Sequence, residues 1–87
     1  MHSIMLIVEK PSDDTNHARN EFWHHDVKEL GICVQRDPDI QRLADNVLLL
    51  TVENHMHSYA KLCAKLAGHY RILFLTEEPQ WVRIKQG

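Results

Sequence analysis

Ser3-Ile-Met-Leu-Ile-Val8 is the most informative segment of the chain, because apolar side chains occupy both of its alternating faces. Successive residues of a strand point to opposite faces of a sheet, so a strand of this kind is covered on both sides. Two further apolar runs follow, at Val47-Leu-Leu-Leu-Thr-Val52 and at Tyr70 to Leu75. We therefore expect a sheet in which Ser3 to Val8 is a central strand.

A first helix is predicted from about Asp14 to Leu30, after turn residues that begin at Pro11. Its apolar face consists of Ala18, Phe22, Val27 and Leu30. Gly31 is placed to end this helix, because glycine tolerates the left-handed conformation found at many helix ends. Ile32 to Arg36 then alternates apolar and polar residues, which is typical of a half-exposed edge strand.

A second helix is predicted to begin at the cap residue Asn54 and to end at Gly68. Its apolar stripe consists of Tyr59, Leu62, Cys63 and Leu66. Before it, Asp37-Pro-Asp39 has the composition of a turn, and residues 40–45 suit either one helical turn or the continuation of a hairpin. At the end of the chain, Gln80 to Lys85 alternates in a way that allows a short extra strand.

This order of elements predicts one α+β domain over residues 1–87 with the ferredoxin-like layout βαββαβ. Right-handed crossovers place both helices on one face of a four-stranded antiparallel sheet and leave the other face open. The core is predicted to include Phe22, Leu30, Leu49, Leu62, Leu66 and Phe74. The open face would carry Met5 and Ile7, so we expect a homodimer that uses this face or an edge strand.

The composition excludes several classes of protein. With 44% hydrophobic and 25% charged residues, the chain is neither a disordered tail nor a fibrous repeat. Ten Lys and Arg stand against twelve Asp and Glu, and a formal net charge of -2 excludes bulk attraction to nucleic acid or anionic membranes. No apolar run approaches the roughly 20 residues of a spanning helix, and no signal peptide is visible, so we expect a soluble, cytoplasmic domain.

Seven histidines in 87 residues raise the question of a metal site. The tight groups are His24-His25 and His55-x-His57, but residues one or two apart point in different directions from a regular helix. Zinc sites use helical histidines four residues apart or closely paired cysteines, and neither pattern occurs. We therefore expect solvated histidines and no metal or other cofactor.

Nucleophilic and acid–base catalysis have little support in the sequence. Cys33 and Cys63 lie in apolar patterns and are expected to be reduced core cysteines. Glu9 follows the first strand directly, and in a dimer it could meet its symmetry mate around a divalent cation such as Mg²⁺. Asp13 is the second carboxylate of this alternative, although an acidic group there also complements the dipole of the following helix.

A candidate binding surface lies in the C-terminal segment. If this segment is extended, Trp81, Arg83 and Lys85 share one face, and an aromatic ring beside two cations is typical of nucleic-acid or acidic-partner contacts. The same pattern also fits an edge strand protected by lysine and arginine, with Trp81 covering the core.

The layout, together with the Trp-bearing tail, resembles the small ferredoxin-like proteins of CRISPR adaptation and their toxin–antitoxin relatives. In those families an Asp closes the first strand and is tied to metal-dependent nuclease activity, whereas this chain reads Val8-Glu9-Lys10. The sequence therefore favours a non-enzymatic regulatory module, inhibitor-like or antitoxin-like, that binds a protein or a nucleic acid. A metal-dependent nuclease using Glu9 or Asp13 is the alternative.

Overall fold

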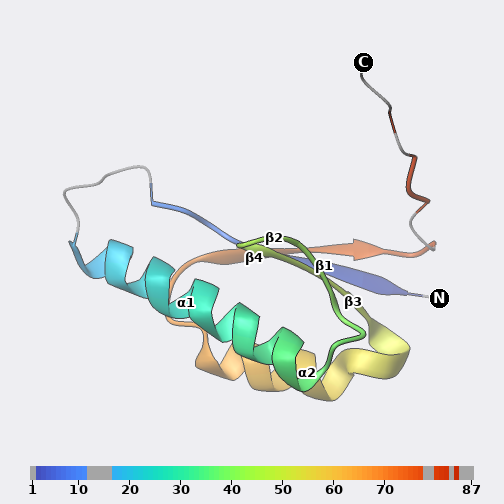
Figure 1. Cartoon of the computed structure of the whole chain (residues 1–87), viewed down its shortest axis with the longest axis horizontal. Coiled ribbons are helices and arrows are strands. Elements are labelled where there is room, and N and C mark those ends of the chain that lie inside the picture. Colours follow the sequence, from blue (N-terminus) through green and yellow to red (C-terminus); the bar gives the residue numbers. More distant parts are fainter. Residues whose placement is uncertain (1, 12–16, 78–79, 83, 85–87) are drawn as a thin grey trace.

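The computed structural model describes residues 2–11, 17–77, 80–82 and 84, and it has a layer of two helices beneath a four-stranded sheet (Figure 1). The elements in chain order are β1 (Ser3–Val8), α1 (His17–Arg36), β2 (Gln41–Ala44), β3 (Val47–Thr51), α2 (Val52–Lys65) and β4 (Tyr70–Leu75). The strands are antiparallel in the order β2-β3-β1-β4. The predicted ferredoxin-like layout is confirmed.

The register of the sheet separates its residues into two faces. Ile4 lies opposite Leu50 on β3 and Phe74 on β4, whereas Met5 lies opposite Leu49 and Leu73. Directly opposed residues of antiparallel strands share a face. The face toward the helices contributes Leu6, Val8, Leu48 and Leu50 to the core, and the helix layer with its following loop adds Leu30, Cys33, Ile40 and Leu62.

Helix α1 is longer than predicted, and the expected edge strand at Ile32 to Arg36 is wrong. Leu30, Cys33 and Val34 all contact the core, which is the i, i+3, i+4 spacing of one helical face. Gly31 therefore lies inside the helix, where glycine costs only about 1 kcal/mol relative to alanine. The edge strand is instead β2, so residues 40–45 follow the hairpin alternative rather than the helical turn.

Helix α2 begins earlier and ends earlier than predicted. Thr51 is its N-cap residue and makes no side-chain cap hydrogen bond, so the predicted capping role of Asn54 is wrong. The helix ends at Lys65, and Gly68 lies beyond it. Gly68 packs so closely on α1 that an added Cβ would lie 3.1 Å from Asp26 Oδ2 and 3.3 Å from Phe22 Cβ. A close approach, and not a left-handed helix end, explains this glycine.

The predicted core is confirmed in part. Leu30, Leu49 and Leu62 are buried, and Leu66 is half-buried against the core. The predicted burial of Phe22 and Phe74 is wrong, because their side chains are 44% and 64% exposed. Phe74 lies on the outer strand β4, whereas the helices pack mainly over the central strands β1 and β3.

Two further predictions concern the extra C-terminal strand and the absence of a membrane-spanning helix. Residues 80–82 and 84 lie in no strand, and the other residues of the predicted extra strand are outside the part of the chain that is described. Among the described residues, no helix has both the length and the apolar character that crossing a membrane requires.

Candidate functional site

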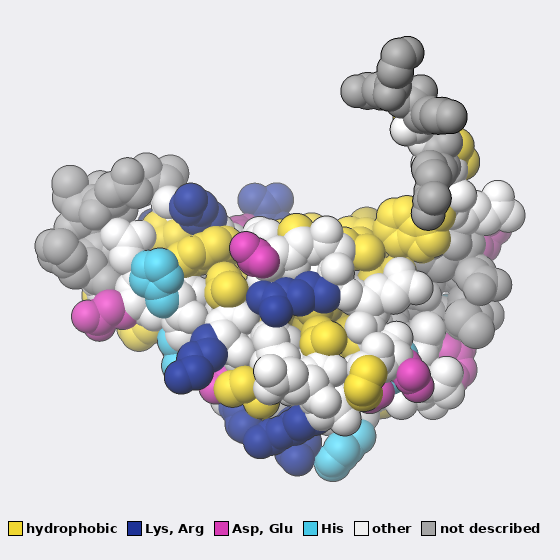
Figure 2. Space-filling view, viewed as in Figure 1, with side chains coloured by type: hydrophobic (Ala, Val, Ile, Leu, Met, Phe, Trp, Pro, Cys, Tyr) yellow, Lys and Arg dark blue, Asp and Glu magenta, His cyan; other side chains and the backbone are white. Residues whose placement is uncertain are grey.

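The open face of the sheet is apolar at its centre, as predicted from Met5 and Ile7. Both residues are half-buried, and β3 places Val47 and Leu49 beside them. Leu73 lies opposite Met5 on β4 and is 52% exposed. In Figure 2, hydrophobic side chains gather along the upper edge of the molecule, where the sheet lies. The helices cover the opposite face, so this one is available for a partner.

The outer edge formed by β4 is also apolar. Tyr70, Ile72 and Phe74 point to the helix side of the sheet and are 37%, 37% and 64% exposed. Because β4 ends the strand order, its outward backbone groups pair with no other strand of the described residues. Edges of this kind are templates for strand addition unless a bulge, a proline or a charge protects them.

The opposite edge, β2, has that protection. It is four residues long, its register shifts between Arg42 and Ala44, and Arg42 donates hydrogen bonds to the carbonyl oxygens of Val27 and Asp45. A short, bulged strand with an anchored arginine does not invite pairing. This contrast identifies β4, and not β2, as the edge of the sheet that is open to strand addition. We call Met5, Ile7, Ile72, Leu73 and Phe74 together the apolar sheet surface.

Glu9, the candidate catalytic carboxylate, forms an ion pair with Arg71 at the rim of this surface. The hydrogen bond from the Arg71 guanidinium lowers the pKa of the Glu9 carboxyl, although partial burial opposes the shift. Arg71 is the only charged side chain that β4 contributes, so the pair neutralises the charge at this edge. Asp13 lies outside the described residues. The pairing of the two carboxylates in the nuclease alternative therefore stays a prediction.

His55 contradicts the prediction that the histidines are solvated. Its side chain is only 6% exposed, because it lies in the first turns of α2 beneath the end of α1. The backbone N–H of Thr51 donates to its Nδ1 at 3.0 Å, so the neutral ring carries its hydrogen on Nε2. Nε2 has no hydrogen-bond partner among the described residues and lies 3.9 Å from Asp37 Oδ1.

Asp37, Asp39 and His55 approach one another closely enough to be considered as metal ligands. However, a metal-bound Nε2 must have lost the hydrogen that the Thr51 contact assigns to it. The Asp37 carboxylate also accepts a hydrogen bond from Ser58 at 3.1 Å. These contacts fit a link between the end of α1 and the start of α2 better than they fit an ion.

Asp26 is an important residue that the sequence did not reveal. It is fully buried, and its carboxylate accepts hydrogen bonds from the backbone N–H groups of Ala67 at 2.8 Å and Gly68 at 2.7 Å. His25 Nδ1 lies 2.9 Å from the same carboxylate. Asp26 therefore fixes the chain after α2 to the side of α1, which is a structural and not a catalytic role.

The remaining candidates are the two cysteines and the residues of the C-terminal tail. Cys33 is buried, and burial raises the pKa of its thiol, which makes it a poor nucleophile. Both cysteines are free, as predicted. In the tail, Trp81 is 62% exposed and does not cover the core, whereas Arg83 and Lys85 lie outside the described residues.

Comparisons of the chain with protein-family models, with curated proteins and with solved structures give no match. The class of the molecule therefore rests on its own topology, a ferredoxin-like α+β domain with an uncovered apolar surface.

Proposed function

We propose that this chain is a non-enzymatic binding module that acts as a homodimer through the apolar sheet surface. The observation that carries the proposal is β4, a six-residue outer strand with exposed apolar side chains on both of its faces. Water contact with such a surface is unfavourable, and exposed contiguous apolar patches mark interaction sites.

A second copy of the chain fits this surface for two reasons. A two-fold interface places the same patch on both partners, and an uncharged apolar patch is complementary to itself. The ion pair with Glu9 balances Arg71, the one charge that β4 contributes, so Arg71 does not repel the second copy. Two β4 strands can also pair antiparallel about such an axis, which would satisfy their outward backbone groups.

The experiment compares the mass of the protein in solution for the wild type, Leu73→Glu and Phe74→Glu. Leu73 and Phe74 are neighbours on β4 that point to opposite faces. Dimerisation through the open face is lost mainly in Leu73→Glu, whereas edge pairing is weakened in both variants. Gln35→Glu is the control, because Gln35 is exposed on α1, one helical turn after Gly31, which lies next to Arg42 of the opposite edge strand β2. A wild type that remains a monomer at high micromolar concentration would disprove the dimer.

The nuclease alternative makes a different prediction. It requires Glu9 to bind a divalent cation, although Arg71 already binds that carboxylate. Labelled RNA and DNA incubated with the protein and Mg²⁺ or Mn²⁺ should therefore remain intact, with EDTA as the metal-free control. Metal-dependent cleavage that disappears in Glu9→Gln would overturn the proposal of a non-enzymatic module.

A further inference from the structure

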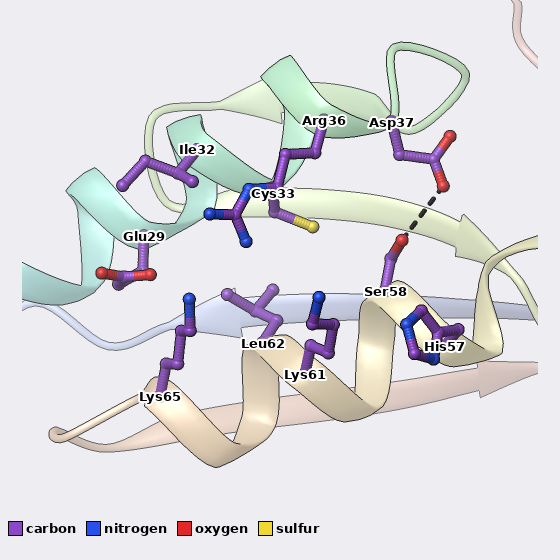
Figure 3. Close-up of a pocket in the computed structure, with 10 residues that line it drawn as sticks. All are labelled: Glu29, Ile32, Cys33, Arg36, Asp37, His57, Ser58, Lys61, Leu62 and Lys65. Atoms are coloured by element: carbon purple, nitrogen blue, oxygen red, sulfur yellow. Dashed lines mark hydrogen bonds between the residues drawn. The ribbon is translucent and has the colours of Figure 1, made fainter.

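A groove between the two helices contains three cationic side chains that point toward one space (Figure 3). Arg36 comes from the last turn of α1, and Lys61 and Lys65 come from α2. Its volume is about 220 Å³. None of the residues that line this groove belongs to the apolar sheet surface, so the two sites are separate.

Glu29 and Asp37 also line the groove, but neither is paired with one of the three cations. Among the described residues, none of the three cations forms an ion pair. Lys61 and Lys65 are four residues apart on one helix, a spacing at which like charges destabilise the helix. An anion between them and Arg36 would relieve this repulsion.

The acidic groups that line the groove face other partners. Glu29 Oε1 lies 3.9 Å from His25 Nε2, on the same helix. The Asp37 carboxylate accepts the Ser58 hydroxyl and lies 3.9 Å from His55 Nε2. With His57 neutral, the lining carries three positive and two negative charges on a chain whose net charge is -2. The excess of positive charge is local to the groove.

We propose that this groove binds a small organic phosphate. A phosphate monoester carries between about 1.5 and 2 negative charges at neutral pH, which suits several converging cations better than a single carboxylate does. The arginine guanidinium offers parallel N–H groups that match two phosphate oxygens. Ile32 and Leu62 provide an apolar wall that an organic group can contact, and this distinguishes the ligand from inorganic phosphate.

Phenyl phosphate is the probe, and amide chemical shifts of the full chain in a buffer of low ionic strength are the readout. We expect titration to shift resonances of residues along the facing sides of α1 and α2. Inorganic phosphate should bind more weakly, because it cannot use the apolar wall. Arg36→Gln and Lys61→Gln should each weaken binding by about tenfold, since each removes a charge-assisted hydrogen bond.

Lys28→Gln is the matched control, because Lys28 is an exposed cation on α1 that does not line the groove. It should bind phenyl phosphate as the wild type does. Equal weakening in this control would indicate attraction to any surface cation and would overturn the proposal, as would the absence of shifts along the groove. If phenyl phosphate and inorganic phosphate bind equally well, the proposed preference for an organic phosphate is wrong. Leu73→Glu should leave the titration unchanged, so failure of the dimer does not affect this test.

Discussion

Asp26 stabilises the fold through a contact between distant segments. Its two oxygens receive the backbone N–H groups of Ala67 and Gly68 inside the protein. In Asp26→Asn, one of these N–H groups would face an amide N–H in place of an oxygen. A buried donor left without an acceptor costs about 1–3 kcal/mol, so we expect that loss in the free energy of unfolding measured with urea. Glu21→Gln, an exposed change on the same helix, should have little effect, and equal losses would contradict the assigned role.

The ion pair between Glu9 and Arg71 predicts a pH dependence. Because Arg71 lowers the pKa of the folded Glu9 carboxyl, the pair stabilises the protein fully above the pKa of the unfolded chain. This contribution disappears as the pH falls through the lowered pKa of the folded state. The urea midpoints of the wild type and Glu9→Gln should therefore differ at neutral pH and converge in acid. A difference that is unchanged in acid would show that charge is not its source.

Residues such as Asp26 show why part of the molecule could not be predicted. The partners of Asp26 are 41 and 42 residues away, and no local pattern announces them. The same holds for His55, whose burial depends on the position of the end of α1. The alternation of Met5 and Ile7, in contrast, is a local pattern, and it located the open face correctly.

At the scale of elements, the strands were predictable and the helix ends were not. β1, β3 and β4 are apolar runs of five or six residues with polar flanks, a pattern that indicates strands. Ile32 to Arg36 alternates like a strand, but it also continues the helical spacing that Leu30 begins. The helix prevails because it buries Cys33 against the core. The burial of Phe74 could not be predicted, because the apolar pattern of residues 70–75 does not show whether the strand is central or outer in the sheet.

Gly31 and Gly68 provide a pair of substitutions that tests the boundaries of the two helices. Gly31→Ala adds a methyl group inside α1, where the nearest atom is Arg42 Nη1 at 3.1 Å, the far end of a flexible side chain. The variant should gain up to about 1 kcal/mol of stability from helix propensity. Gly68→Ala should instead lose stability, because its Cβ would press on buried Asp26 and on Phe22 Cβ. Urea unfolding of both variants checks the pair, and a stabilising Gly68→Ala would contradict the close packing described.

At the scale of the whole molecule, the proposed dimer couples stability to protein concentration. Association of folded chains stabilises them by mass action, whereas a monomer unfolds at a temperature that does not depend on concentration. A hundredfold rise in concentration above the dissociation constant should stabilise each chain by about 1 kcal/mol. For a domain of this size, that corresponds to a rise in Tm of roughly 4–8 °C.

The same measurement on Leu73→Glu separates association from intrinsic stability. Leu73 is 52% exposed on the open face, so a glutamate there costs the isolated chain little and breaks the apolar sheet surface. The Tm of this variant should therefore be independent of concentration and should match that of the dilute wild type. Gln35→Glu should keep the concentration dependence, because Gln35 is exposed on α1 toward the opposite edge strand β2. If the wild-type Tm is constant over this range, the apolar sheet surface does not join two copies of the chain.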